Sequence, residues 1–515
     1  MTSKGNPSNQ PTGAAKKLDC YSGLYSARAE VLEPASVDEL SDIFAAAKEA
    51  GRRITLRAGA HSFDGQALGD DLVVSMVRMD AIEVLTDERK MRVGPGATWG
   101  AIIARVQPLG LVPAVTVTTE HATAGGTLSG DCLSRFSPSY GKEGEWIEGF
   151  DLLTTEGDLL HCTAPTRDSD PATWTTEERA FCGVIGGLGY LGAVVSITYR
   201  LLPTKAGDGK VGVRTIVRKF ETFADLADDL VPTTRRTHLE ESDPDDPEKL
   251  DAIWSALGPR GKETPTLLFF TSTYTASSER RRMALHQPKL LFRILVEWLM
   301  RVTFISKIFW RIYYRFVFRD GEEYIDDLEG FAFFMDGNAR AKHIGRSLGF
   351  SMRNVQQSFV VPSDPVTEGG WDRAKDDLVE WLEFAHDFLL KRNLTPTLND
   401  VLFLPTDLPF LLSASADKAG FVVSYAFETS NRRTLRRAEA AFSDLADVLW
   451  EQFHGRVYLV KNVFAKQETL ANMYGEHAVE FARLKQQLDP GALLRNDFLE
   501  RTFGELLSEA GRPAS

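Results

Sequence analysis

The stretch Arg57-Ala-Gly-Ala-His-Ser-Phe-Asp-Gly65 places a histidine in a glycine-rich setting between two apolar runs, residues 54–56 and 72–76. The flanking runs are typical of strands, and the stretch itself is too rich in glycine for a helix. A tight turn between two strands is therefore expected. Turns of this kind let backbone N–H groups converge on a phosphate, because no Cβ stands in the way.

The bulk composition is that of a folded protein with more than one lobe, since 515 residues exceed one ordinary core. The formal net charge of -13 argues against nucleic acid as a partner, because phosphate neutralisation requires a basic surface. The cysteines form no CxxC pair, which predicts neither a disulfide framework nor a metal site and favours a reducing, cytoplasmic location; they are Cys20, Cys132, Cys162 and Cys182.

The pattern along the chain predicts an organised domain after a polar start. Residues 1–17 contain no apolar core of a signal peptide and are expected to be a disordered lead-in. Alternating strand and helix patterns, with a hairpin at residues 150–162, predict one domain up to Pro203. An acidic run at residues 240–249 marks the change to a second domain. Amphipathic helices are expected in that domain at residues 371–390 and 433–453.

Gly187-Leu-Gly-Tyr-Leu-Gly192 has the GxGxxG spacing of a dinucleotide-binding fingerprint. That fingerprint requires a strand before the glycines and a helix after them. The run that follows, residues 193–202, is β-branched and alternating, which predicts a strand instead. We therefore reject a nicotinamide dinucleotide site and expect a helix at residues 177–181 that is turned by the glycines into a strand.

Five segments in a fixed order are more specific than any one of them. They are Arg57 to Gly65, Gly94-Pro-Gly-Ala-Thr-Trp-Gly100, Thr123-Ala-Gly-Gly-Thr-Leu-Ser-Gly130, Ile185-Gly-Gly-Leu-Gly-Tyr-Leu-Gly192 and Leu488-Asp-Pro-Gly-Ala-Leu-Leu-Arg-Asn-Asp-Phe498. The chain resembles the vanillyl-alcohol oxidase/p-cresol methylhydroxylase (PCMH) flavoproteins over residues 31–203. The resemblance returns at Phe359-Val-Val-Pro362, at Gly455-Arg-Val-Tyr-Leu-Val-Lys-Asn462 and at the C-terminal segment.

The resemblance implies an α+β fold with a PCMH-type two-lobed FAD-binding domain at residues 18–203. It further implies a substrate (cap) domain at residues 204–455, with an antiparallel sheet flanked by helices. Residues 456–515 are then a C-terminal segment that completes the FAD and active site. Within the superfamily, the C-terminal portion looks most like the aldonolactone and alditol oxidases and the decaprenylphosphoryl-ribose oxidases.

The cofactor implied by the resemblance is FAD, and no metal is expected. In the resembled oxidases, a histidine at the place of His61 is bonded to the 8α carbon of FAD, and a neutral ring nitrogen suits that addition. Covalent FAD through His61 is therefore expected, with a noncovalent histidine that satisfies the turn as the alternative. This chain has Ala-Gly-Ala-His-Ser where those oxidases usually have Gly-Gly-His or Gly-x-Gly-His. The expected cofactor-binding residues are Arg57, Gly59, Ala60, His61, Ser62, Gly125, Gly126, Thr127, Gly130, Gly189 and Asn496.

The expected catalytic residues are Lys461 and Gln356. Alternation over residues 457–463 predicts a strand whose one face is apolar except for Lys461. A substrate-contacting lysine stands at this position in the resembled ribose oxidases, and a cation there would orient a hydroxyl or stabilise reduced flavin. The alternative is a lysine that reaches out to solvent. Gln356, before Ser358-Phe-Val-Val-Pro362, is expected to be a polar contact on the substrate side of the flavin, and the alternative is a glutamine at a strand start that faces water.

Three further residues are weaker candidates. His121 precedes the glycine segment, but loop histidines are more often hydrogen-bonded structure than bases. Cys132 is expected to be a buried small hydrophobe. Tyr425 is expected to belong to the core rather than to a pocket.

Residues 280–319 form a basic, apolar arm. Ten lysines and arginines face one acid, Glu297, and the residues between are aliphatic and aromatic. No uncharged stretch is long enough to span a bilayer. Charges every four residues predict a helix that lies on an anionic membrane surface, and the alternative is a helix that covers the core with a solvated basic side.

These features predict an FAD-dependent oxidoreductase. It would take hydride to flavin N5 from a hydroxyl-bearing carbon of a sugar, polyol, lactone or lipid-linked sugar. The expected partners are a small-molecule or lipid-linked substrate and a membrane touched through residues 280–319, so the location is cytoplasmic with peripheral contact at the inner face of a membrane. The alternatives are a membrane-associated flavin-dependent C=C reductase, similar to the sterol Δ24-reductases, and a flavin-dependent biosynthetic cyclase.

Overall fold

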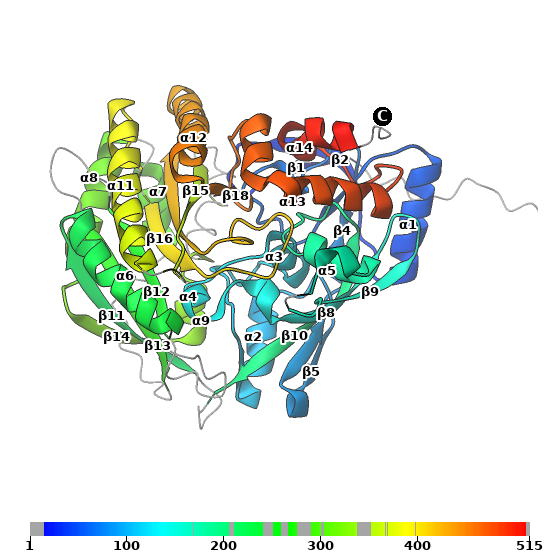
Figure 1. The fold of residues 1–515 in the computed structure, drawn as a ribbon, viewed down its shortest axis with the longest axis horizontal. Coiled ribbons are helices and arrows are strands. Elements are labelled where there is room, and N and C mark those ends of the chain that lie inside the picture. Colours follow the sequence, from blue (N-terminus) through cyan, green and yellow to red (C-terminus); the bar gives the residue numbers. More distant parts are fainter. Residues whose placement is uncertain are drawn as a thin grey trace, which may run out of the picture.

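The structure is a computed structural model that describes a mixed α+β protein. Three sheets and their helices form two lobes that lie side by side (Figure 1). The expected α+β architecture, with a large antiparallel sheet flanked by helices, is confirmed. The residues described are 15–167, 169–204, 211–239, 251–258, 266–275, 290–299, 303–336, 344, 352–365, 367, 369–396 and 398–510.

The first sheet has the strand order β1-β2-β4-β3, with β4 parallel to both of its neighbours. Helix α1 (Val37–Glu49) connects β2 to β3 and begins at Ser36, whose side chain accepts a hydrogen bond from the Glu39 amide. Residues 16 and 17, expected to belong to a disordered lead-in, lie in β1, whereas residues 1–14 of that lead-in fall outside the described residues. The strands are β1 (Lys16–Asp19), β2 (Ser26–Leu32), β3 (Ile54–Arg57) and β4 (Leu72–Ser75).

The second sheet is antiparallel, in the order β5-β6-β10-β8-β9 with β7 paired to β10. The expected hairpin is confirmed as β8 and β9, and its tip contains Gly157 at a φ of 94°. The strands are β5 (Ile82–Leu85), β6 (Lys90–Val93), β7 (Leu111–Pro113), β8 (Ile147–Leu153), β9 (Leu159–Thr163) and β10 (Ala193–Pro203). The helices of this lobe are α2 (Trp99–Val106), α3 (Ala124–Gly130), α4 (Ser137–Tyr140) and α5 (Thr176–Val184).

The rejection of a nicotinamide dinucleotide site agrees with the local structure. The GxGxxG segment follows helix α5 and leads into strand β10, so the glycines turn a helix into a strand. A dinucleotide fingerprint requires the opposite order.

The third sheet has eight antiparallel strands in the order β14-β11-β13-β12-β16-β17-β15-β18. Helices α6, α11 and α12 cover one of its faces (Figure 1). The strands are β11 (Gly212–Phe220), β12 (Asp251–Leu257), β13 (Leu267–Thr275), β14 (Glu322–Asp327), β15 (Arg353–Pro362), β16 (Leu398–Leu404), β17 (Gly420–Thr429) and β18 (Arg456–Tyr458). The helices are α6 (Phe223–Leu239), α7 (Leu290–Leu299), α8 (Thr303–Phe316), α9 (Leu328–Ala332), α11 (Gly370–Lys391) and α12 (Arg432–Phe453).

Side chains alternate between the two faces of this sheet, so one face packs against helices and the other face is left open. On β15, Phe359 points to the helix side, where its ring packs against Trp381 and Phe442. The helices expected at residues 371–390 and 433–453 are confirmed as α11 and α12. The acidic run at residues 240–249 lies outside the described residues, as do residues 280–289 of the basic arm.

The end of the chain returns to the first lobe through α13 (Gln467–Leu488) and α14 (Asp497–Ala510). The Ile54 amide donates to the Leu493 carbonyl at 2.8 Å, which extends the edge of β3. Lys485, which is buried, donates to Asp489 at 2.7 Å and to the Tyr190 carbonyl at 2.8 Å. The C-terminal segment is thereby fixed against the turn that follows α5.

Candidate functional site

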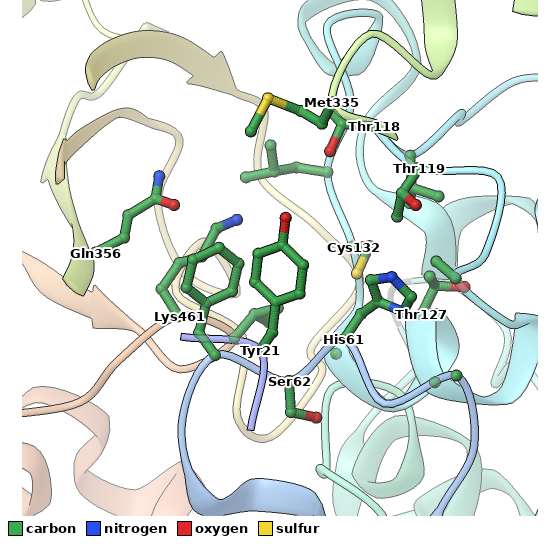
Figure 2. Close-up of a pocket in the computed structure, with 18 of the residues that line it drawn as sticks. Tyr21, His61, Ser62, Thr118, Thr119, Thr127, Cys132, Met335, Gln356 and Lys461 are labelled. Carbon is green, nitrogen blue, oxygen red and sulfur yellow. The ribbon is translucent and has the colours of Figure 1, made fainter. Parts of the chain in front are cut away.

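A cavity of about 930 Å³ lies where the two lobes meet. One wall is made by loops of the first two sheets and the other by the open face of the large sheet (Figure 2). The volume is at the upper end of the range for small-molecule and cofactor pockets.

The turn after β3 forms the nearest part of the loop wall. Residues 57–63 all line the cavity. Gly59 is required at its position, because a Cβ there would lie 2.7 Å from the carbonyl oxygen of His121. Ala60 adopts a left-handed conformation with a φ of 60°. Among the described residues, the backbone amides of Ala60, His61 and Ser62 find no acceptor, so this turn presents a group of free donors.

The glycine segment in α3 forms the next part of the wall. A Cβ at Gly125 would lie 2.6 Å from the Cβ of Pro95, and one at Gly130 would lie 3.2 Å from the side chain of Val460. Side chains are therefore excluded where the segment faces the cavity. The amide of Gly126 also finds no acceptor within the described part of the chain.

Thr127 lines the cavity, but its hydroxyl is engaged behind α3. It donates to a Glu143 carboxylate oxygen at 2.8 Å and accepts from Trp99 Nε1 at 2.9 Å. The Tyr199 hydroxyl donates to the same carboxylate oxygen at 2.5 Å. Burial raises the pKa of Glu143 to about 8, although the hydrogen bonds from Tyr199 and Thr127 lower it.

Gly189 brings a third loop to the cavity, with a φ of 82° that a side chain would disfavour. Its amide, too, finds no acceptor in the chain as described. Three separate loops thus offer free amides to one cavity, which is the arrangement that binds a pyrophosphate.

Two of the expected cofactor contacts, Arg57 and Asn496, support the loops by their hydrogen bonds. Arg57 lines the cavity, but its guanidinium donates to the carbonyls of Ala67 and Asp19, each at 2.9 Å. Asn496 is not among the cavity-lining residues, and its amide nitrogen donates to the Gln66 carbonyl at 3.0 Å. Asn496 therefore holds the turn from behind.

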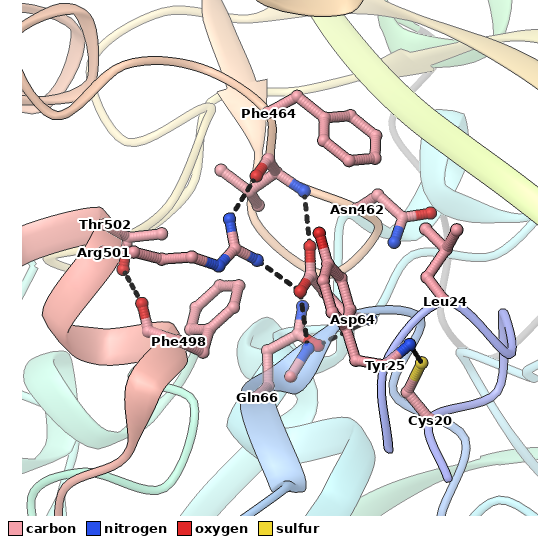
Figure 3. A network of polar contacts seen from close by, with 12 residues as sticks. Cys20, Leu24, Tyr25, Asp64, Gln66, Asn462, Phe464, Phe498, Arg501 and Thr502 are labelled. Carbon is pink, nitrogen blue, oxygen red and sulfur yellow. Dashed lines mark hydrogen bonds and ion pairs between the residues drawn. The ribbon is translucent and has the colours of Figure 1, made fainter. Parts of the chain in front are cut away.

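A buried polar network, absent from the sequence-based expectations, pins the histidine turn (Figure 3). Asp64 accepts hydrogen bonds from the Val463 amide at 3.1 Å and from Arg501 on α14. The side-chain amide of Gln66 donates to the carbonyls of Leu459 and Lys461 at 2.9 and 3.0 Å. The turn that carries His61 and the segment that carries Lys461 are therefore locked together.

His61 points toward the cavity (Figure 2). Its ring centre lies 5.6 Å from that of Tyr21, and Nδ1 is buried with no hydrogen-bond partner among the described residues. Burial lowers the pKa of His61 and so favours the neutral ring, although a hydrogen bond with the Gly59 backbone acts in the opposite direction. His121 stacks at 6.5 Å from His61 but is solvent-exposed and does not line the cavity.

Lys461 lines the cavity beside Phe63, and its local structure corrects a prediction. The strand expected over residues 457–463 ends at Tyr458, and Lys461 follows in a turn. The strand is cut short because the carbonyls of Leu459 and Lys461 bond to Gln66 rather than to a neighbouring strand. The ammonium lies 4.3 Å from the centre of the Phe63 ring, and burial lowers the pKa of this lysine.

Gln356 lines the cavity from β15, next to Lys461 in Figure 2. The neighbouring Gln357 points the other way and donates to the Phe442 carbonyl at 3.1 Å. Tyr425 is fully buried, as expected of a core residue. Cys132, predicted to be buried, is half-buried on the cavity wall, and burial raises the pKa of its thiol.

Asp400 is the most informative residue that the sequence did not reveal. It lines the cavity from β16 and is adjacent to Ser424 of β17, which in turn is opposite Ser358 of β15. The two serine hydroxyls lie 2.8 Å apart, and Ser424 also hydrogen-bonds to Asp400. Burial raises the pKa of Asp400, while the nearby Lys461 lowers it. The result is a polar row across three strands that ends in a carboxylate.

Aromatic side chains line the rest of the cavity. The Arg135 guanidinium lies 3.6 Å from the Phe331 ring centre, and burial lowers its pKa to about 10. Trp254 stacks on Phe270 at 4.2 Å, and Phe270 meets the edge of Phe318 at 5.2 Å. The rings continue to the inner face of α8. The cavity is therefore polar at the end near Lys461 and aromatic at the end near α8.

The fold and the free backbone amides of the three loops are those of a domain that binds a dinucleotide. Residues 29–163 match the family of FAD binding domains, and the chain therefore carries an FAD-binding domain of the PCMH type.

Curated relatives with this domain resemble the chain over limited stretches. A decaprenylphosphoryl-beta-D-ribose oxidase of Mycolicibacterium smegmatis is 28% identical over 31% of this chain and 33% of its own length. An L-gulonolactone oxidase of Bos taurus is 23% identical over 37% of this chain and 39% of its own. A Delta(24)-sterol reductase of Homo sapiens is 28% identical over 25% of this chain and 23% of its own. The chain thus spans between about a quarter and two fifths of the lengths of these relatives.

Proposed function

We propose that this protein is an FAD-dependent oxidoreductase that oxidises a hydroxyl-bearing carbon of a sugar, polyol, lactone or lipid-linked sugar. One observation carries the proposal. A single cavity joins the free amides of an FAD-binding domain to a wall that bears a lysine, a glutamine and a buried carboxylate. Residues 204–455 would serve as the substrate domain that brings this second wall to the cofactor.

The residues present fit FAD. The free amides of Ala60, His61 and Ser62, together with those of Gly126 and Gly189, would hold the pyrophosphate. When bound, FAD supplies a hydride acceptor at N5. Arg57 and Asn496 would act on the cofactor indirectly, by fixing the turn.

The polar end of the cavity can handle the hydroxyl group. Lys461 would hold the substrate oxygen, and Gln356 would fix its orientation. Asp400 would accept the O–H proton while the hydride leaves the same carbon, so that C–OH becomes C=O. A carboxylate whose pKa is raised by burial is better matched to this transfer at neutral pH than an exposed one.

The direct test is optical. The purified protein should show the visible spectrum of bound flavin, and a panel of alcohols, lactones and polyprenyl-phosphate sugars should contain a compound that bleaches it anaerobically. A colourless protein that does not take up added FAD would overturn the proposal.

We also propose that His61 bonds FAD covalently at the 8α carbon. The buried, unpartnered Nδ1 of a neutral ring supports this role. Acid-denatured wild-type protein should give a fluorescent band on a gel, and His61→Ala should not. His121→Ala is the matched control, because this exposed neighbour does not line the cavity. Equal fluorescence from wild type and His61→Ala would refute the bond while leaving FAD binding intact.

A flavin-dependent C=C reductase is the second candidate. The aromatic end of the cavity supports it, because an unsaturated hydrocarbon would fit there without a polar partner. A reductase should be bleached anaerobically by NADPH, whereas the proposed oxidation requires a hydroxyl substrate for bleaching.

A further inference from the structure

Helices α7 and α8 expose an unusual amount of apolar surface. Leu291, Leu295 and Trp298 follow one another at helical spacing on α7, with exposed fractions of 81%, 51% and 52%. On α8, Ile312 is 54% and Phe316 is 69% exposed. More than half of the large, exposed apolar side chains of the described residues lie in these two helices. Exposed apolar surface of this extent marks a contact site.

The opposite sides of the same helices line the cavity. Val296 of α7 and Phe309, Trp310 and Tyr313 of α8 are lining residues. Only the thickness of one helix layer therefore separates the aromatic end of the cavity from the exposed apolar surface. We define this layer, α7 and α8 together, as the roof.

The exposed side of α8 also carries positive charge. Arg311 and Arg315 are exposed on the face that bears Ile308, Ile312 and Phe316. Residues 303–319 contain four basic residues and no acid, in a chain whose net charge is -13. A face that mixes arginine with large apolar groups is complementary to an anionic lipid surface, where the charges meet head groups and the side chains enter the acyl boundary.

A second copy of the chain would fit this face less well. A two-fold contact places the same patch on both partners, so Arg311 and Arg315 would approach their own copies. Among the parts of the chain that the structure describes, no helix combines the length and apolar character needed to cross a bilayer. The mixture of arginine and large apolar side chains on the exposed face of α8 is suited to lying on a membrane.

We propose that the roof docks on an anionic bilayer and that the substrate is an amphiphile that enters the cavity from the membrane through the roof. The substrate's apolar part would lie against Trp254 and Phe270, and its hydroxyl-bearing head would reach Lys461 and Asp400. The exposed side chains of α7 and α8 alone support the docking surface. The oxidation of the substrate's hydroxyl-bearing head rests on the function proposed above.

Co-sedimentation of the full chain with vesicles tests the docking surface. Wild type should pellet with phosphatidylcholine vesicles that contain phosphatidylglycerol, and less protein should pellet as salt is raised. The double variant Arg311→Glu/Arg315→Glu should bind at least about 30-fold more weakly, since each basic residue lost near the surface weakens binding roughly five-fold.

The matched control makes the same change of charge elsewhere. Arg433 and Arg436 are exposed on α12, so Arg433→Glu/Arg436→Glu alters the net charge equally without touching the roof. The control should pellet like wild type. Equal losses from both double variants would refute a specific surface, because the effect would then come from net charge.

Quenching of tryptophan fluorescence tests the apolar part of the contact between the roof and the membrane. Brominated acyl chains quench nearby tryptophans, so Trp298 should be quenched in mixed anionic vesicles, and Trp298→Phe should remove that share of the quenching. Exposed Leu159→Gln, on the hairpin of β8 and β9, should change nothing. Wild type that dimerises through the roof and fails to pellet at low salt would overturn the proposal in favour of a second copy.

These outcomes are separable from those for the proposed function. A yellow protein that does not bind vesicles would keep the oxidoreductase and remove the membrane-borne substrate. A colourless protein that pellets through the roof would keep the docking surface and remove the oxidation.

Discussion

The two ends of the cavity are stabilised by different forces. At the cofactor end, the His61 turn is fixed by buried hydrogen bonds and an ion pair that join Asp64 and Gln66 to distant segments of the chain. At the roof, the inner face of α8 packs through Tyr314 into an apolar cluster with Leu268 and Phe270 of β13, while its outer face has exposed apolar groups. Directional bonds dominate one end and non-directional packing the other.

The difference corresponds to what each end would have to do. Backbone amides that bind a pyrophosphate must keep their positions to a fraction of an ångström, and buried polar networks provide such specificity. An apolar tail needs a surface that excludes water and tolerates small shifts, and aromatic packing provides that. Variants that perturb each end should therefore lose different properties.

The largest effect is expected where the two ends meet, at Asp400. Asp400→Asn removes the proton acceptor without changing side-chain size, and general-base catalysis contributes about 10²–10⁴-fold to a rate. Reduction of the flavin by a hydroxyl substrate should slow by about 10³-fold, with FAD content unchanged. Stopped-flow measurement of anaerobic bleaching checks this.

The pH profile separates a base from a structural residue. A base acts in its ionised form, so wild-type reduction should fall as pH drops through the pKa of Asp400, which burial places above its usual range. This acid limb should disappear in Asp400→Asn. If the slow variant keeps the limb, another group is the base.

The next largest effect is expected at the network of the cofactor end. Asp64→Ala leaves the buried Val463 amide without its acceptor and removes the ion pair with the exposed Arg501, and an unsatisfied buried donor costs up to about 3 kcal/mol of unfolding free energy. Urea denaturation should show this loss, together with reduced FAD content. Asp444→Ala, which removes an exposed ion pair with Arg392, should stay within about 0.5 kcal/mol of wild type.

Lys461→Met removes the positive charge of the lysine and keeps an apolar side chain of similar length. If the ammonium supplies about 2.7 kcal/mol of charge stabilisation, reduction by substrate should slow by about 10²-fold. Sulfite, which adds to flavin N5 and is favoured by a nearby cation, should bind more weakly to the variant. Unchanged sulfite affinity and unchanged reduction would place Lys461 outside the reaction.

The sequence predicted the parts of the site that depend on local chemistry. Glycines mark turns wherever a Cβ would collide, so the loops that contain Gly59 and Gly125 could be recognised directly. Lys461 could be found because a lone cation in an apolar stretch requires a partner. Its strand was predicted wrongly because Gln66, almost 400 residues earlier in the chain, takes the backbone hydrogen bonds at that point.

Asp400 and the Asp64 network were not predictable in the same way. Asp400 follows Leu398-Asn399 in an ordinary strand, and only the pairing of β16 with β17 places it beside Ser424. Asp64 follows the histidine turn as an ordinary turn residue, and its partner Arg501 lies on α14, near the end of the chain. Both depend on long-range register, which a pattern of neighbouring residues does not contain.

The smallest effect is expected at Ala60, where the chain departs from the glycine usual in the resembled oxidases. A left-handed conformation costs an alanine about 1–2 kcal/mol, and glycine adopts it freely but gains entropy in the unfolded chain. Ala60→Gly should therefore raise the unfolding free energy by up to about 1 kcal/mol in urea. Ala45→Gly, at an exposed helical position of α1, should lower it by a similar amount. If both substitutions destabilise equally, the turn carries no strain at Ala60, and the rigidity of the cofactor end comes from the Asp64 network alone.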